Sequence, residues 1–131
     1  MVDLSHRDIV WDVRWCPYQN FHHLFATASA DRTARIWSLS PDESKGISLL
    51  GTYTGHAGSV NSIRFHPTQN IVCTSSGDHT CHIWKCDTLM RDSINGYVLL
   101  FYRLKIVKKK KKFVHHLCDY QCHQQQLIQL K

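Results

Sequence analysis

The chain has 131 residues, which is room for about one domain, and its 43% apolar and 20% charged residues are typical of a globular protein. No stretch of about 18 or more uncharged apolar residues occurs, so the sequence predicts no membrane-spanning helix. The first eight residues lack the apolar core of a secretory signal peptide, and we therefore expect a protein of the cytoplasm, the nucleus or both.

The net charge of +6 comes entirely from the last third of the chain. Residues 1–86 contain seven Lys or Arg and seven Asp or Glu, so their charges cancel. Residues 87–131 contain nine Lys or Arg and three Asp or Glu, and they include five consecutive lysines at 108–112 and a Gln-rich end. A lysine run is typical of a solvated segment or of one that contacts phosphates. The charge therefore separates a neutral first part from a basic tail.

The neutral part, about residues 5–86, contains an internal repeat. Matching residues are 50 positions apart at the start of the two copies, as in His6 and His56, and 47 apart at their end, as in Trp37 and Trp84. Self-similarity over a period of this size is the signature of a repeat architecture. The two copies span about residues 5–53 and 54–86.

Each copy is predicted to consist of short antiparallel strands joined by turns. In the first copy, the apolar residues Val10, Val13 and Trp15 are three and then two positions apart. An undisturbed strand repeats every two residues, so the wider gap indicates a β-bulge. The residues that follow predict a strand, a tight turn at 30–32, another strand, a loop and an outer strand. The predicted strands after the first span Leu24–Ser29, residues 33–37 and Ile47–Tyr53.

The second copy repeats this order with the same irregular spacing at Val60, Ile63 and Phe65. Its next strands are predicted at Ile71–Ser76 and residues 80–84. After residue 86 the sequence shows no recognisable loop, outer strand or further Gly-His pair, and residues 97–107 are apolar but too short to span a membrane. We therefore expect residues 87–131 to form an irregular tail outside the repeats.

The segments SHRDIVWDVRWCP…LFATASADRTARIW and GHAGSVNSIRFHP…IVCTSSGDHTCHIW resemble WD repeats. The resemblance covers about residues 5–86, and the spacing of His, Ser-x-Asp and Trp makes it specific. The first copy departs from the family pattern, because Ser5 stands where a Gly usually precedes the His. The resemblance implies an all-β fold: two four-stranded antiparallel blades of an incomplete β-propeller, followed by the irregular basic tail.

The resemblance also implies a hydrogen-bonded set of four side chains in each blade. The Trp indole would donate to the Ser hydroxyl, the Ser hydroxyl to one His nitrogen, and the other His nitrogen to the Asp carboxylate. Ser, His and Asp together would also suit a hydrolase. Because the set occurs twice and ends on a Trp, we expect a structural link and no catalytic residue. The two sets are His6, Ser29, Asp31 and Trp37, and His56, Ser76, Asp78 and Trp84.

The two predicted bulges place Trp11 and Asn61 where they could contact a partner, and large aromatic residues are favoured binding anchors. Alternatively, Trp11 packs between the blades. We expect a non-catalytic protein–protein interaction scaffold, as a fragment or short isoform of a longer protein. It would need further blades or self-associate, because a propeller typically has about four to eight. The alternative function is binding of nucleic acid or an anionic surface through the lysine run, which lacks interleaved aromatic residues.

The tail also contains residues that could ligate zinc. They do not form the two well-spaced pairs that a structural zinc site usually shows, so we expect no metal and no cofactor. The residues concerned are His115, His116, Cys118, Cys122 and His123.

Overall fold

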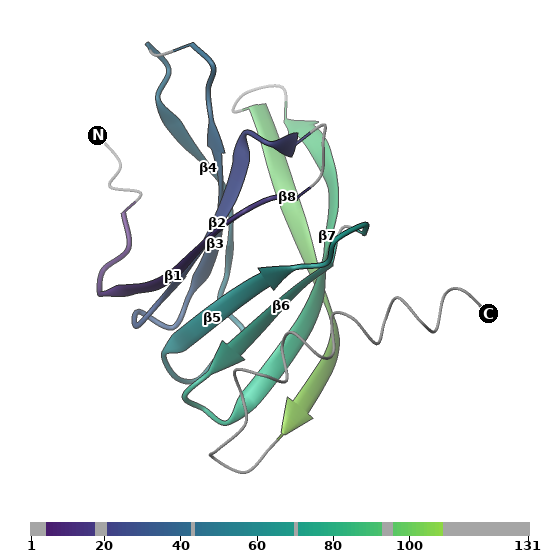
Figure 1. Ribbon diagram of the computed structural model, residues 1–131. Helices are drawn as coiled ribbons and strands as arrows, with labels where there is room; N and C mark the ends of the chain where they lie inside the picture. The colour runs from purple at the N-terminus through teal and green to yellow at the C-terminus, as the bar shows by residue number, and fades with distance from the viewer. Residues whose placement is uncertain (1–4, 18–20, 43, 70, 93–95, 109–131) are drawn as a thin grey trace, which may run out of the picture.

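The computed structural model describes residues 5–17, 21–42, 44–69, 71–92 and 96–108, with side chains described as far as Lys85. Every regular element in these ranges is a β-strand, and the strands form two four-stranded antiparallel sheets (Figure 1). This arrangement confirms the predicted all-β fold with two four-stranded blades. In the described part of the chain, no helix has the length and apolar character needed to cross a membrane.

The first sheet, called blade 1, contains β1 to β4 in chain order. β2 and β4 have the predicted bounds, and β3 begins one residue later than predicted and ends two residues later. The bulge in β1 is also confirmed, because the register with β2 shifts between Val10 and Asp12 and leaves Trp11 as the extra residue. The strands are β1 Val10–Trp15, β2 Leu24–Ser29, β3 Ala34–Leu39 and β4 Ile47–Tyr53.

The second sheet, blade 2, contains β5 to β8 in chain order. β5 has the same bulge as β1, with a register shift between Val60 and Ser62 that leaves Asn61 as the extra residue. The inner strands of the two blades, β1 and β5, are neighbours. The strands are β5 Val60–Phe65, β6 Ile71–Ser76, β7 Thr80–Asp92 and β8 Gly96–Lys108.

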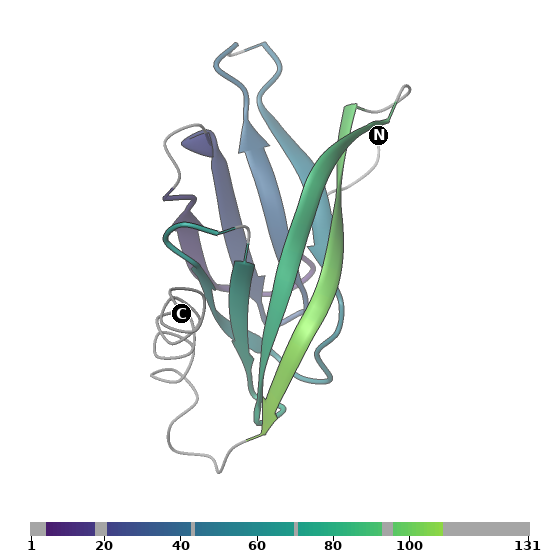
Figure 2. The ribbon, with the colours of Figure 1, turned by 90° about the vertical axis from the view of Figure 1, so that its right-hand side faces the viewer.

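The expectation that the chain becomes irregular after residue 86 needs correction. β7 continues to Asp92, and β8 pairs with it as the fourth strand of blade 2, so that the two form a long ribbon beside β4 (Figure 2). The sequence concealed β8 because residues 97–107 are a nearly continuous apolar run. Such a run lacks the alternation that marks a half-buried strand, and it does not distinguish a strand from a buried helix. Residues 109–131 of the expected tail lie outside the described residues.

The turn between the second and third strands has the same conformation in both blades. Arg32 and His79 have φ angles of 71° and 68°, in the left-handed region that non-glycine residues seldom adopt. The preceding aspartate supports this turn, because Asp31 Oδ1 accepts a hydrogen bond of 2.9 Å from the backbone N–H of Thr33. In blade 2, Asp78 Oδ1 accepts the equivalent hydrogen bond of 2.9 Å from the backbone N–H of Thr80. Side-chain hydrogen bonds of this kind are how Asp stabilises tight turns.

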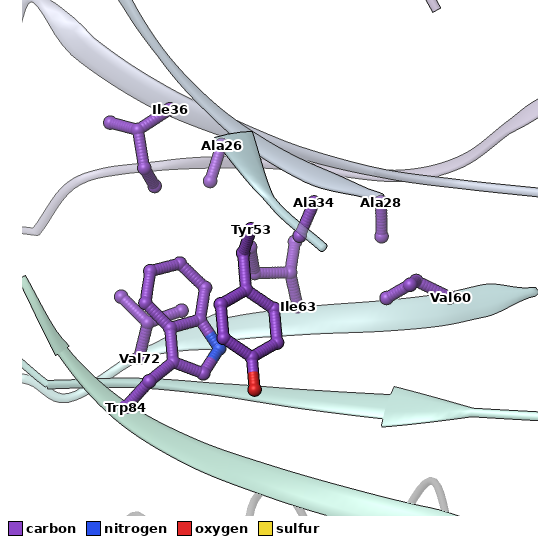
Figure 3. Packing of buried hydrophobic residues seen from close by; sticks show 9 residues of the cluster. All are labelled: Ala26, Ala28, Ala34, Ile36, Tyr53, Val60, Ile63, Val72 and Trp84. Carbon is purple, nitrogen blue, oxygen red and sulfur yellow. The ribbon is translucent and has the colours of Figure 1, made fainter. Parts of the chain in front are cut away.

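The blades pack face to face through one apolar core. Blade 1 contributes mainly small side chains, whereas blade 2 contributes larger ones, including Trp84, which is completely buried. Small residues on one face let the larger residues of the other approach closely, and fully burying a large apolar side chain stabilises a fold by about 1.5–3 kcal/mol. The core residues are Ala26, Ala28, Ala34, Ile36 and Tyr53 of blade 1 and Val60, Ile63, Val72 and Trp84 of blade 2 (Figure 3).

Blade 1 leaves the corresponding face open. Val13 and Trp15 of β1 are 53% and 57% exposed. Their counterparts in blade 2 are Ile63, which is fully buried against blade 1, and Phe65, which is half-buried. Asp12, which directly precedes Val13, points the other way and contacts β5. The two blades therefore do not close into a ring.

Candidate functional site

Four side chains form a hydrogen-bonded chain across blade 2. Trp84 Nε1 of β7 donates to Thr74 Oγ1 of β6 at 3.2 Å, and Thr74 Oγ1 lies 2.8 Å from His56 Nε2. His56 Nδ1 lies 3.0 Å from Asp78 Oδ2 in the β6–β7 turn. Because an ionised carboxylate only accepts, His56 carries its proton on Nδ1, and its Nε2 accepts from the Thr74 hydroxyl. The chain ties the entry loop, the turn and two strands together.

Blade 1 contains the same chain at corresponding positions. Trp37 Nε1 donates to Thr27 Oγ1 at 2.8 Å, and Thr27 Oγ1 lies 2.6 Å from His6 Nε2. His6 Nδ1 lies 2.8 Å from Asp31 Oδ2. The geometry is preserved, but Trp37 is only half-buried because it lies on the open face of blade 1.

In both blades the structure brings the predicted His, Asp and Trp together, but the prediction that a serine links them is wrong. The linking hydroxyl belongs to Thr27 and Thr74, which the sequence analysis missed. Ser29 Oγ instead accepts from the backbone N–H of Asp31 at 3.1 Å and donates to the carbonyl of Asp8 at 3.3 Å. Ser76 Oγ accepts in the same way from the backbone N–H of Asp78 at 3.1 Å.

The strand register explains this correction. β2 and β3 pair so that Trp37 lies opposite Phe25. Thr27 is two residues farther along the same face and is the diagonal neighbour of Trp37, within reach of a long side chain. Ser29 is four residues from Phe25, at the turn. The position of the turn, which was predicted correctly, fixes which residue of β2 lies opposite Trp37. It could therefore have identified the linking threonine from the sequence.

Hydrogen bonds keep the aspartates of both sets ionised. Burial alone would raise the pKa of Asp78, but donation from the Thr80 hydroxyl, the Ala57 backbone N–H and His56 outweighs burial and holds this pKa well below its ordinary value. The pKa of Asp31 is lowered in the same way in blade 1. Each carboxylate is thus a fixed negative charge on which the turn and the entry loop converge.

The linked threonine, histidine and aspartate side chains are also the kinds of group that form a nucleophilic catalytic triad. A nucleophile must be reachable by substrate and lie beside donors that stabilise an oxyanion. Thr74 is completely buried, and its oxygen already accepts the indole N–H of Trp84. This arrangement fits a structural link, as the sequence analysis expected.

Blade 2 contains one further cluster that the sequence analysis did not consider. His56, Asp78 and His82 each offer a ligand atom within 4.8 Å of the other two. The two imidazole rings are stacked, with centroids 3.8 Å apart and planes inclined by 12°. A metal ion lies close to the plane of each imidazole that binds it, at about 2.0–2.1 Å from the nitrogen. Two nearly parallel rings at this separation offer no such point, so the cluster does not fit a metal ion.

Two candidate features of the tail lie outside the described residues, namely lysines 109–112 of the basic run and the zinc candidates. The latter are His115, His116, Cys118, Cys122 and His123.

The two predicted contact residues, Trp11 and Asn61, meet through Ser59. Trp11 Nε1 donates to Ser59 Oγ at 3.0 Å, and Ser59 Oγ donates to Asn61 Oδ1 at 2.9 Å. Trp11 nevertheless remains 55% exposed. Its indole thus bridges the two blades at one edge and presents the rest of its surface to solvent. We call Trp11, Ser59 and Asn61 the Trp11 rim.

Asp12 anchors the strand beneath this rim. Its carboxylate accepts from the guanidinium of Arg64 and from the backbone N–H of Ile63 at 3.1 Å, both on β5. Its other oxygen lies 3.0 Å from Arg14 Nε. Because Asp12 follows Trp11 directly, these contacts hold the bulge of β1 against blade 2.

Comparison with known proteins gives a consistent result. Residues 2–38 and 47–85, more than half of the chain, match the family model described as WD domain, G-beta repeat. Over 82 residues, or 63% of this chain, the sequence is 49% identical to WD repeat-containing protein 37 of Xenopus tropicalis and 45% identical to that of Homo sapiens. It is 32% identical over 84 residues, or 64% of this chain, to Autophagic-related protein 16.2 of Caenorhabditis elegans. The chain spans 15% of the length of each of these relatives.

Proposed function

Because the chain belongs to the WD-repeat family, we propose that it is a non-catalytic scaffold that binds other proteins through the Trp11 rim. Proteins built from WD repeats act generally as interaction scaffolds. The observation that supports the rim is the position of Trp11, which is 55% exposed although its indole N–H is held by Ser59 of the other blade. An exposed aromatic ring that is already fixed loses little conformational entropy on binding.

The surroundings of the rim supply the rigidity that a binding surface needs. Asp12 holds β1 against β5, and the hydrogen-bonded set of blade 2 fixes the loop that leads into Ser59. Binding residues are commonly placed on loops that a rigid scaffold positions. Trp11 and Asn61 are the extra residues of two bulges, so they can face outward without interrupting the strand pairs.

A comparison of two variants of the full chain tests this proposal. Proteins retained from extract by immobilised chain are quantified for the wild type, for Trp11→Ala and for Leu39→Ala. Leu39 is the matched control because it is an exposed apolar residue of blade 1 outside the rim. We expect a set of proteins that Trp11→Ala loses and Leu39→Ala keeps, and that a photo-crosslinker at Asn61 captures. Equal retention by all three chains, with unchanged circular dichroism spectra, would contradict the proposal.

The open face of blade 1 supports a second part of the same proposal, that the chain takes up further blades or self-associates. The rings of Trp15 and Phe25 are 5.3 Å apart, and those of Phe25 and Trp37 are stacked 6.2 Å apart, so the face carries a continuous aromatic row. In blade 2 the corresponding face is covered by blade 1. A large exposed apolar patch is a common interaction site, since covering it removes apolar surface from water.

A further inference from the structure

The contact by which blade 2 holds blade 1 has a counterpart on the open side of blade 1. In blade 2, one oxygen of the Asp12 carboxylate accepts from the backbone N–H of Ile63 at 3.1 Å and from the guanidinium of Arg64. Hydrogen bonds between charged groups are roughly twice as strong as those between neutral groups. The inner strand of blade 2 therefore contains a small carboxylate site, which Asp12 of the other blade occupies.

Blade 1 has the same two groups at the corresponding positions of its inner strand. Val13 and Arg14 of β1 precede Ile63 and Arg64 of β5 by 50 positions, which is the offset of the first part of the repeat. The strand register agrees, because Val13 and Ile63 each lie opposite the linking threonine of their own blade. The two inner strands thus carry the same donors in the same order.

The backbone N–H of Val13 points away from β2, toward the edge of the sheet. In antiparallel pairs, opposite residues alternate between those that exchange hydrogen bonds and those that do not. Cys16 donates its N–H to the carbonyl of Leu24 at 2.9 Å, so the residues two and four positions before Cys16 direct their backbone groups to β2. Val13 lies three positions before Cys16 and directs its N–H outward, as Ile63 does in blade 2. Because β1 is an edge strand of its sheet, this donor can pair with another chain.

The guanidinium of Arg14 can complete the site. The Arg14 side chain is 48% exposed, and its Nε lies 3.0 Å from Asp12 Oδ1. A guanidinium has five N–H donors, and the contact with Asp12 uses one of them. Arg64 shows that an arginine at this position of the repeat binds a carboxylate that comes from outside its own blade.

Apolar side chains border the site on the open face of blade 1. Val13 and Trp15 are both more than half exposed, and the ring of Trp15 lies 5.3 Å from that of Phe25. In blade 2, the corresponding apolar face is covered by blade 1 while Asp12 binds beside it. A fitting ligand therefore presents a carboxylate next to apolar side chains, as β1 itself does with Asp12 between Trp11 and Val13.

We propose that Val13 and Arg14 form a carboxylate-binding site whose occupant is an extended segment of another protein, with an Asp or Glu side chain between apolar residues. The two residues thereby select what covers the open face of blade 1, and this assignment depends on that part of the proposed function. The inner strands of a second copy do not supply the carboxylate. Asp12 of that copy is bound by its own blade 2, and blade 2 has Ser62 at the position of Asp12.

The test titrates the full chain with the peptide acetyl-Val-Trp-Asp-Val-amide, which copies residues 10–13, and with the same peptide carrying Asn in place of Asp. We expect the Asp peptide to shift the backbone amide resonance of Val13 and to bind about tenfold more tightly than the Asn peptide, because hydrogen bonds to a charged group are the stronger ones. Arg14→Gln should remove this difference between the peptides. The control Arg32→Gln makes the same change of charge at another exposed arginine of blade 1 and should preserve the difference.

Val13→Pro removes the backbone N–H at an outward-facing edge position, where proline is tolerated, and it should also weaken binding of the Asp peptide. Circular dichroism checks that each variant folds. If a variant does not fold, the Val13 amide resonance of the wild type decides, since an unmoved resonance at saturating Asp peptide would overturn the site.

Two other results would also overturn the site, and they separate it from the proposed function. Equal binding of the Asp and Asn peptides would refute the carboxylate site and keep the open face as an interaction surface. If neither peptide binds, the site is refuted, and sedimentation of the chain alone shows whether the open face still associates.

Discussion

Replacement of Thr74 by valine tests the central link of the hydrogen-bonded set in blade 2. Valine has nearly the same shape as threonine, so the change removes the hydroxyl without opening a cavity. The Thr74 hydroxyl accepts from Trp84 Nε1 and donates to His56 Nε2. Both partners are buried, so each would lose its hydrogen bond to Thr74 at a site that is shielded from water.

The expected cost follows from these two losses. A buried polar group left without its partner costs about 1–3 kcal/mol, so Thr74→Val should lower the free energy of unfolding by about 2–6 kcal/mol. Ser76→Ala is the matched comparison on the same strand face. Ser76 Oγ accepts from the backbone N–H of Asp78, and the loss of one such hydrogen bond should cost about 1 kcal/mol.

Urea denaturation followed by tryptophan fluorescence measures both changes, and the indole N–H resonance of Trp84 reports the link directly. We expect this resonance to shift and its hydrogen exchange to accelerate in Thr74→Val but not in Ser76→Ala. If Ser76→Ala were the more damaging change, the serine link inferred from the family pattern would be correct and the threonine link refuted.

Three further predictions concern the turns and the sets. Thr27→Val should cost less than Thr74→Val in the same denaturation assay, because Trp37 lies on the open face and water can reach it. The pKa values of Asp31 and Asp78 are lowered in the folded chain, so the ionised carboxylates contribute their full stabilisation at a pH well above the ordinary pKa of 3.8, and this stabilisation is lost as the pH falls below 3.8. The urea midpoints at about pH 5 and about pH 3 should therefore differ by more in the wild type than in Asp78→Asn. His79→Gly should stabilise the chain by up to about 1 kcal/mol. The left-handed conformation costs a non-glycine residue about 1–2 kcal/mol, which glycine avoids, but glycine loses more conformational entropy on folding and this offsets part of the gain. A lower melting temperature of His79→Gly would contradict this prediction.

The features that the sequence predicted well are those fixed by local chemistry. β2, β4 and β6 have the predicted bounds because apolar and β-branched residues in each are followed by residues that favour turns. The bulges at Trp11 and Asn61 were visible because the apolar spacing changes from two to three. Both signals occur within a few residues and repeat in the second copy.

The features that it missed depend on pairing between strands. Whether Thr74 or Ser76 meets Trp84 depends on strand register, since both residues lie on the same face of β6. The contact between Asp12 and Arg64 joins different blades, and nothing in the local pattern of either residue indicates it. β8 was missed for a related reason, because its pairing with β7 and not its alternation makes it a strand.

The open face of blade 1 leads to a final prediction about association. Val13 and Trp15 are more than half exposed on an inner strand whose counterpart in blade 2 is covered, so burying them in a second contact would remove a large apolar area from water. Val13→Ser combined with Trp15→Ser should shift sedimentation of the chain toward the monomer. Ile47→Ser is the matched control, because Ile47 is 55% exposed but lies at the start of the outer strand β4. A wild-type chain that sediments as a monodisperse monomer and melts in one sharp transition would show that two blades suffice. An equal effect of Ile47→Ser would show that association does not depend on this face.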